Sequence, residues 1–291
     1  MNNNLLVSVC MITYNHASFV RDAIEGVLSQ KTHFKFELII SDDVSSDNTR
    51  EICESYQRDY PEIIRLVFRE QNLGICKNFY QTLSLAKGQY VAVCEGDDYW
   101  TDPYKLQKQI DYLSVHPSAI MLYHNAVVDT DGRKSLFIPL NKEPHGLCTE
   151  ELLFKWAIPT ASIVFRRDSF FVPNPFKVFT NADYMLEILL NTKGEIHYIP
   201  DIMSVYRRHA DSASDVLNRN QLSLYRGLVD MLQYCKQFYP EMEKPLFEDA
   251  IVRYGNMAKA IEREKKYPFL KYCDWRFYKR LIFKMFRIKR V

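Results

Sequence analysis

A cluster of carboxylates directly follows an apolar run in this sequence. Residues 89–94 are apolar enough to form a buried strand, and Glu95-Gly96-Asp97-Asp98 comes next. Three carboxylates within four residues repel one another, so a cation or several hydrogen-bond donors must offset the repulsion. Mg²⁺ and Mn²⁺ bind few protein carboxylates and complete their coordination with phosphate oxygens. The cluster therefore predicts a metal–diphosphate site; the simpler alternative is a solvated acidic turn.

Two further polar clusters follow predicted strands. Residues 5–12 run into Thr13-Tyr14-Asn15, and residues 36–40 run into Asp42-Asp43. Ligands of open α/β sheets bind at the carboxyl ends of the strands, so we expect all three clusters to meet at one edge. A carboxylate there can accept a hydrogen bond from a nucleobase or a ribose hydroxyl. Helix capping is the alternative for the Asp42-Asp43 cluster, and turn chemistry is the alternative for Thr13-Tyr14-Asn15.

The spacing of apolar residues predicts an α/β fold with a mostly parallel open sheet flanked by helices. The expected strands are 5–12, 36–40, 63–68, 89–94, 119–125, 162–166, 195–199 and 203–206. The expected helices are 18–29, 47–59, 74–86, 103–115, 181–191, 221–238 and 246–264. A small, polar stretch at 210–214 predicts a boundary between a sheet domain, 1–214, and a C-terminal helical region, 215–291.

Composition and motifs exclude several classes. With 47% hydrophobic and 25% charged residues, the 291-residue chain is neither disordered nor collagen-like. It has no GxGxxG after the first strand and no GxxxxGK[ST], which removes the main support for dehydrogenases and P-loop enzymes. Its seven cysteines form no CxxC pair, so we expect free thiols. No signal peptide or membrane-spanning run is visible, which favours a cytoplasmic protein.

Charge is concentrated at the C-terminus. The whole chain carries a net charge of +2, yet residues 265–291 contain ten Lys or Arg and one Asp. On a helix, residues 275–291 place basic side chains on one face and apolar ones opposite, as in helices that lie on anionic membranes. We therefore expect residues 267–291 to bind the inner face of the membrane peripherally, or else to pack on the main domain. The acidic remainder argues against nucleic acid as a partner.

The chain resembles the bacterial inverting glycosyltransferases of family 2, which have the Rossmann-like GT-A fold. The matching segments are Val7–Asn15, Ile39–Thr49, Asn72-Leu73-Gly74 and the turn that ends in Asp97-Asp98. The match covers the first ~115 residues closely and continues more loosely to Ser214. It departs from the family at Thr13, where Pro is frequent, and at Val44, where Gly is frequent.

The resemblance implies a role for each cluster. It makes 1–115 the donor-binding half of the sheet domain and 116–214 the acceptor-binding and catalytic half. Donor-binding residues would be Thr13, Tyr14, Asn15, Asp43, Glu95, Asp97, Arg208 and His209. Asp98, together with Asp97, would ligate Mn²⁺ or Mg²⁺, and His209 is a further candidate ligand. The catalytic base would be Asp183, at the start of a helix, although an acidic residue there also stabilises the helix dipole.

The implied activity is inverting transfer of a sugar from a nucleotide-diphosphate donor, with UDP as the default nucleotide. The acceptor would be a hydroxyl of a glycan or of a lipid-linked acceptor, in the assembly of a surface polysaccharide or O-antigen. The alternatives are a catalytically inactive nucleotide-sugar-binding protein and a sugar nucleotidyltransferase. The loop after residue 12 lacks the Gly-rich, basic sequence expected of the latter.

Overall fold

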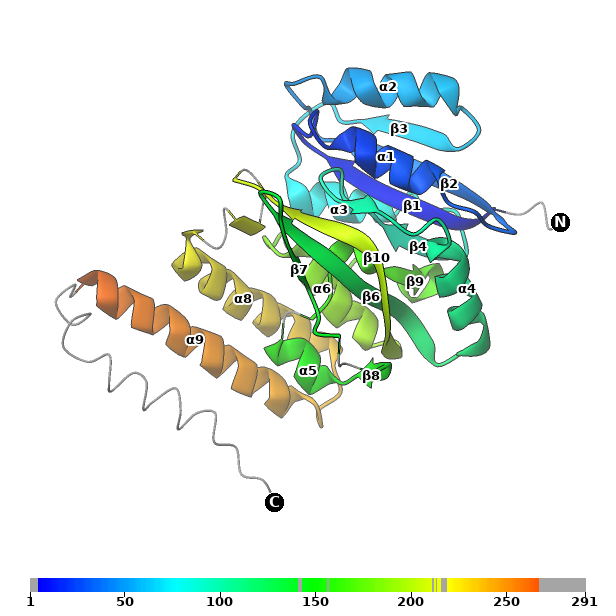
Figure 1. Cartoon of the computed structure of the whole chain (residues 1–291). Coiled ribbons are helices and arrows are strands. Elements are labelled where there is room, and N and C mark those ends of the chain that lie inside the picture. The colour runs from blue at the N-terminus through cyan, green and yellow to red at the C-terminus, as the bar shows by residue number, and fades with distance from the viewer. Residues whose placement is uncertain are drawn as a thin grey trace.

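The chain folds around one mixed sheet with helices on both faces (Figure 1). The structure is a computed structural model that describes residues 5–140, 143–155, 157–210, 212, 214–215 and 219–266. The strand order of the sheet is β3-β2-β1-β4-β9-β6-β10-β5, with β7 beside β6 and β8 beside β10. The predicted α/β class is thereby confirmed.

The elements have the following bounds. The strands are β1 (Leu5–Thr13), β2 (Lys35–Asp42), β3 (Ile64–Phe68), β4 (Tyr90–Val93), β5 (Tyr99–Trp100), β6 (Ala119–Thr130), β7 (Arg133–Leu136), β8 (His145–Leu147), β9 (Val164–Arg166) and β10 (Glu195–Arg208). The helices are α1 (Val20–Leu28), α2 (Thr49–Asp59), α3 (Ile75–Leu83), α4 (Lys105–Val115), α5 (Thr149–Phe154), α6 (Ala182–Asn191), α8 (Gln221–Cys235) and α9 (Lys244–Lys266). Short 3₁₀ turns are η1 (Thr160–Ser162), η2 (Arg167–Ser169) and η3 (Lys236–Phe238).

Two parallel groups of strands make up most of the sheet. Strands β3, β2, β1 and β4 are parallel neighbours, and β6 is parallel to β10. Strand β9 joins the two groups because it pairs antiparallel with both β4 and β6. Strands β5, β7 and β8 add antiparallel edges. The parallel groups place several carboxyl ends at one edge, where the polar clusters were expected.

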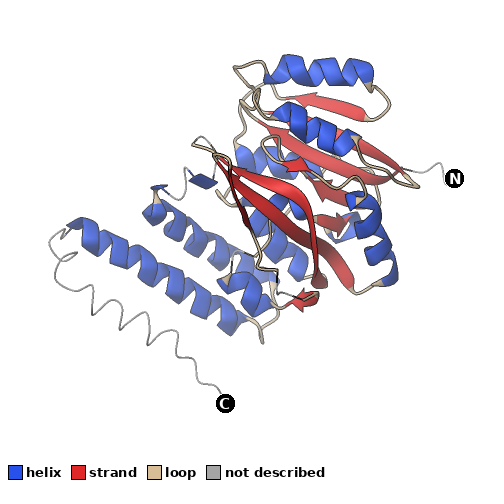
Figure 2. Cartoon of the chain, viewed as in Figure 1, coloured by secondary structure: helices blue, strands red, loops and turns tan. Residues whose placement is uncertain are grey.

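The two faces of the sheet carry separate cores. Along β1, Val9 and Met11 point to one face and Cys10 and Ile12 to the other, as the two-residue period of a strand requires. Helices α1, α2 and α4 cover the first face. Helices α3, α5, α6, α8 and α9 cover the second (Figure 2). Strands β1, β2 and β4 thus carry buried side chains on both faces, which explains their unbroken apolar runs.

One expected pair of strands is a single element. Residues 195–199 and 203–206 were predicted as two strands because Pro200 and Asp201 interrupt the apolar pattern. The structure has one continuous strand, β10, which follows β6 with register shifts around Ile199 and Ile202. Pairing with a long neighbour therefore outweighs the local break. The short elements β5, β7, β8 and α5 were not predicted, because too few residues form them to give a periodic signal.

The C-terminal helices belong to the second core. Helices α8 and α9 lie side by side next to α5 and α6 (Figure 1). Leu228 and Met231 of α8 and Phe247 of α9 join the same apolar cluster as α6. Among the described residues, no helix has both the length and the apolar character needed to cross a membrane. The predicted amphipathic tail, 267–291, lies outside the described residues.

Candidate functional site

The three polar clusters meet at one edge of the sheet. Thr13 ends β1 and is paired in register with Asp42 at the end of β2. The acidic turn follows β4, and its Gly96 N–H donates to the Ile12 carbonyl at 3.0 Å. The Asp43 N–H donates to the Thr13 carbonyl, also at 3.0 Å. The ends of β1, β2 and β4 are therefore joined directly by backbone hydrogen bonds.

A cavity of about 580 Å³ opens beside this edge. The predicted site residues that line it are Thr13, Tyr14, Asp43, Glu95, Asp97, Asp183 and Arg208. Its walls come from distant parts of the chain. Thr13 ends β1, Asp183 lies in the first turn of α6, and Arg208 ends β10. Within the described residues, Asn15, Asp98 and His209 are not part of the lining.

The structure separates the two aspartates of the acidic turn. The Asp98 residue is only 2% exposed, and its Oδ1 accepts the Arg207 backbone N–H at 2.8 Å. The Asp97 side chain is 16% exposed and lines the cavity. Asp97 Oδ2 lies 3.3 Å from His209 Nε2 and 3.9 Å from His16 Nε2. Asp97 therefore faces the cavity, whereas Asp98 is turned inward. The sequence analysis named Asp98 first as a metal ligand, and that stays a prediction.

The pKa shifts of the turn also distinguish Asp97 from Glu95 and Asp98. Burial raises the pKa of Glu95 well above its ordinary range, and the neighbouring Asp97 and Asp183 add to the rise. Burial, with the nearby Asp97, likewise raises the pKa of Asp98. For Asp97, burial is outweighed by the His209 hydrogen bond and by His16, so its pKa falls below the ordinary value. Within the acidic turn, the pKa of Asp97 is thus lowered, whereas the pKa values of Glu95 and Asp98 are raised.

His16 was not among the predicted site residues, although it follows the Thr13-Tyr14-Asn15 cluster directly. Burial lowers the pKa of His16, while Asp97 opposes the shift. Its imidazole packs against the acidic turn because Gly96 has no side chain. A Cβ on Gly96 would lie 2.8 Å from Thr13 Oγ1 and 2.9 Å from His16 Nδ1. Neither of those buried atoms has a hydrogen-bond partner among the described residues.

Arg207 was likewise not among the predicted site residues, although its neighbours Arg208 and His209 were. Its side chain donates to the Asp97 carbonyl at 3.2 Å, forms an ion pair with Asp22 of α1, and covers the Tyr99 ring at 4.2 Å. The neighbouring Arg208 points into the cavity and pairs with Asp215. The two-residue period of β10 could have signalled that Arg207 and Arg208 face opposite ways.

The loops around the donor side of the cavity are held by side-chain hydrogen bonds. Both carboxylate oxygens of Asp43 accept backbone N–H groups, from Leu73 at 2.8 Å and from Gly74 at 2.9 Å. Asn15 Oδ1 accepts the Ser46 N–H at 2.8 Å. Val44 has a φ of 66°, a left-handed conformation that is strained for a β-branched residue and that glycine adopts freely. This conformation explains why the family often has Gly here.

Asp183 lies at the cavity surface in the first turn of α6, where the sequence placed it. Its Oδ2 accepts the Thr160 hydroxyl at 2.7 Å, and its Oδ1 accepts the Tyr184 N–H at 2.8 Å. These two bonds orient the carboxylate and leave a further lone pair on each oxygen. Nothing in the sequence pointed to Thr160, because it comes from η1, 23 residues earlier.

The residues of the acidic turn fit a divalent metal only in part. Asp97 and His209 supply a carboxylate and an imidazole side by side, and Asp98 Oδ2 is buried without a hydrogen-bond partner among the described residues. No three metal-binding side chains converge on one point in the described part of the chain. A metal there would therefore need several oxygen ligands from a phosphate group, as Mg²⁺ and Mn²⁺ commonly do.

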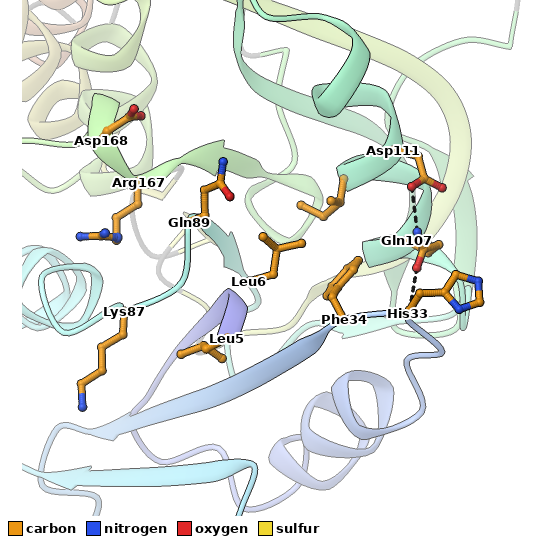
Figure 3. A pocket seen from close by; sticks show the side chains of 11 residues that line it. Leu5, Leu6, His33, Phe34, Lys87, Gln89, Gln107, Asp111, Arg167 and Asp168 are labelled. Atoms are coloured by element: carbon orange, nitrogen blue, oxygen red, sulfur yellow. Dashed lines mark hydrogen bonds between the residues drawn. The ribbon is translucent and has the colours of Figure 1, made fainter. Parts of the chain in front are cut away.

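A second cavity, of about 680 Å³, lies at the opposite ends of the strands (Figure 3). Leu5, Leu6 and Phe34 form its apolar floor, with Lys87 and Arg167 on one side and Asp111 on the other. Its charges are of both signs and do not converge on one point. Because ligands of open α/β sheets bind at the carboxyl ends of strands, the cavity at Asp97 and Asp183 is the better candidate for catalysis.

The chain belongs to glycosyltransferase family 2. The model of that family, described as "Glycosyl transferase family 2", matches residues 8–213. Those residues include the acidic turn, Asp183 and the cavity walls described above. The expected family and the GT-A fold are thus confirmed.

The chain is similar to the following three proteins, two in sequence and one in structure. "Uncharacterized protein Rv1520" of Mycobacterium tuberculosis is 40% identical over 70% of this chain, which spans 59% of that relative's length. The "Putative teichuronic acid biosynthesis glycosyltransferase TuaG" of Bacillus subtilis is 29% identical over 72% of this chain and 81% of its own length. The structure of S. aureus TarS 1–349 in complex with UDP-GlcNAc has a TM-score of 0.61 at 15% identity, covering 90% of this chain and 92% of TarS.

Proposed function

We propose that this protein is an inverting, metal-dependent glycosyltransferase that takes a sugar from a nucleotide-diphosphate donor, with UDP as the first nucleotide to test. One observation carries the proposal: Asp97 and an Asp183 carboxylate oriented by Thr160 line the same cavity. Asp97 can help to hold a metal at the leaving diphosphate while Asp183 accepts the proton of the attacking hydroxyl.

The donor would lie along the carboxyl ends of β1, β2 and β4. Thr13, Tyr14 and Asp43 line the cavity at the ends of β1 and β2, where the resemblance places the base and ribose. The exposed Tyr14 ring offers a face on which a base can stack. Arg208, on the far wall, can balance charge on the diphosphate, although it first has to loosen its pairing with Asp215.

Asp97 and His209 would hold the metal, and phosphate oxygens of the donor would complete its coordination. A bound Mn²⁺ or Mg²⁺ would offset the charge that develops on the departing nucleoside diphosphate. Asp98 would act indirectly, because its carboxyl fixes the backbone of β10 at Arg207 and so sets the position of His209 two residues later.

Asp183 would take the proton from the acceptor hydroxyl as that oxygen forms a bond to the anomeric carbon. The bond from that carbon to the diphosphate breaks in the same step, so the anomeric centre inverts and no covalent sugar–enzyme intermediate forms. Thr160 would hold the Asp183 carboxylate in place throughout. The relationship to TuaG supports a role in assembling a surface polysaccharide.

A two-part assay tests the proposal. Thermal shifts with a panel of UDP-, GDP- and dTDP-sugars and Mn²⁺ identify the donor, and release of nucleoside diphosphate measures its turnover. We expect Asp183→Asn to bind the donor as the wild type does but to lose ~10²-fold or more in transfer. An inactive sugar-binding protein would show donor binding with no turnover in any variant, and a nucleotidyltransferase would release pyrophosphate instead.

A further inference from the structure

Asn181 lies two residues before Asp183 and is almost fully buried. It is 5% exposed and lines the cavity together with its chain neighbours Thr180 and Ala182 and with Asp183 itself. Its backbone carbonyl accepts the Met185 N–H at 3.0 Å, so the start of α6 fixes its place. A polar side chain is thus held at the cavity wall beside the proposed base.

The Asn181 amide is not used by its own helix. Asn is among the residues that most often cap a helix, by accepting a backbone N–H of the first turn through the side-chain oxygen. Asn181 occupies the N-cap position of α6, yet its side chain makes no capping hydrogen bond. Within the part of the chain that the structure describes, its amide has no other hydrogen-bond partner. The Nδ2 donors and the Oδ1 acceptor therefore remain for a ligand.

The cavity offers little positive charge to an acceptor. Four carboxyl groups belong to its described lining, from Asp43, Glu95, Asp97 and Asp183. Arg208 is the one Lys or Arg among those described lining residues, and it pairs with Asp215. The proposed function already assigns Arg208 to the diphosphate. An acidic acceptor would bring a further negative charge to this wall without a cation to offset it, and like charges held close together repel.

The surroundings of Asn181 suit a sugar ring without charge. Thr160 and Thr180 contribute hydroxyl groups to the same cavity, and Ile158 and Pro159 contribute apolar surface. A neutral sugar carries hydroxyl groups around its ring and C–H groups on its faces, so it can use both kinds of surface.

We propose that Asn181 binds the acceptor sugar and that the acceptor sugar at this site is uncharged. The Asn181 amide would hydrogen-bond a hydroxyl next to the one that loses its proton to Asp183. This bond would hold the ring so that the attacking oxygen faces the anomeric carbon of the donor. The inference rests on the proposed function, which supplies the transfer step at Asp183.

Transfer to p-nitrophenyl glycosides tests the charge of the acceptor. The full chain is assayed with Mn²⁺ and the nucleotide sugar that gives the largest thermal shift, and products are measured by mass spectrometry. The neutral acceptors are the glucoside, galactoside, mannoside and N-acetylglucosaminide. The acidic ones are the glucuronide and the galacturonide, which differ from the glucoside and the galactoside only by a carboxylate at C6.

The best neutral glycoside should have a kcat/KM at least tenfold above that of either acidic glycoside. An acidic glycoside that accepts as well as the best neutral one would refute the assignment of an uncharged acceptor. Failure of every neutral glycoside while the donor is still hydrolysed would refute it too.

Two variants test the role of Asn181. Asn181→Ala should raise the KM for the best neutral glycoside about tenfold, with the donor KM and the melting temperature unchanged. Asn220→Ala is the matched control, because Asn220 caps α8 by accepting the Ser223 N–H at 3.4 Å and is not part of the described cavity lining. It should lower the melting temperature and leave both KM values unchanged. An acceptor KM that Asn181→Ala leaves unchanged, or a raised donor KM in that variant, would overturn the proposal.

Donor hydrolysis, measured as release of nucleoside diphosphate without any glycoside, separates the two hypotheses. Water then takes the place of the acceptor, so Asn181→Ala should hydrolyse the donor at the wild-type rate. Absence of both hydrolysis and transfer in the wild type would contradict the proposed function and this inference with it. Transfer by the wild type that does not depend on Asn181 would refute this inference alone.

Discussion

Lys105 gives the sharpest test of how burial shapes this protein. It is the first residue of α4 and is fully buried, and its Nζ donates to Gln109 Oε1 at 2.7 Å and lies 4.0 Å from the Trp100 ring. Burial lowers its pKa from 10.5 to about 7. We expect Lys105→Met to remove a pH dependence of stability that the wild type shows between pH 7 and pH 9.

The sign and size follow from proton linkage. Between pH 7 and pH 10.5 the unfolded chain holds a proton on Lys105 that the folded chain has largely released. The free energy of unfolding therefore rises with pH through this window, and below pH 7 the effect of Lys105 is constant. One pKa unit corresponds to about 1.36 kcal/mol, so Lys105 contributes a rise of about 2 kcal/mol from pH 7 to pH 9.

Urea unfolding, followed by far-UV circular dichroism at pH 7, 8 and 9, measures this slope. Lys105→Met also leaves Gln109 Oε1 without its donor, which costs about 1–3 kcal/mol at every pH, so the slopes and not the absolute stabilities are compared. Lys108→Met is the matched control on the same helix. Its ion pairs with Asp102 and Asp201 raise the pKa of Lys108, so it stays protonated throughout the window. Equal slopes for Lys105→Met and the wild type would refute the reasoning.

Four further substitutions test the site and its supports. In steady-state assays of nucleoside diphosphate release, Asp97→Asn should reduce the rate by about 100-fold or more, and Asp98→Asn should reduce it by less than about tenfold. The reverse order would indicate Asp98 as the metal ligand. Gly26→Ala would place a Cβ 2.8 Å from the Trp100 carbonyl, and we expect a loss of about 1–3 kcal/mol in urea unfolding, with unchanged stability contradicting that close packing. Asp43→Ala removes the acceptor of two backbone N–H groups, so we expect about 3 kcal/mol less stability and weaker donor binding, measured by urea unfolding and thermal shift; wild-type values for both would show that the loop is held by other contacts.

Local patterns were sufficient to predict the elements that carry the site. The apolar runs before Thr13, Asp42 and Glu95 are buried on both faces of the sheet, and burial on both faces is what makes a strand recognisable without alternation. The start of α6 at Asp183 was equally local. From these the fold and the edge that holds the cavity could be predicted, whereas the family was inferred from the resemblance of whole motifs.

The orientation and the pKa of each carboxyl in the acidic turn depend on the tertiary structure. Glu95, Asp97 and Asp98 lie within four residues, and no sequence pattern says which of their pKa values is lowered. The pKa of Asp97 falls because His209, 112 residues away, lies beside it, and Asp98 turns inward because the Arg207 backbone N–H, 109 residues away, meets it there. The contact between Thr160 and Asp183 arises in the same way.

Some properties of the acidic turn are therefore determined by its own short segment and others by the tertiary structure. Its composition and its place after β4 are properties of a short segment, and short segments determine their own strand and turn preferences. The pKa and orientation of each carboxyl depend on burial and on charged or hydrogen-bonding neighbours. Those neighbours come from β10 and from the loop after β1, and only the folding of the sheet brings them to the turn.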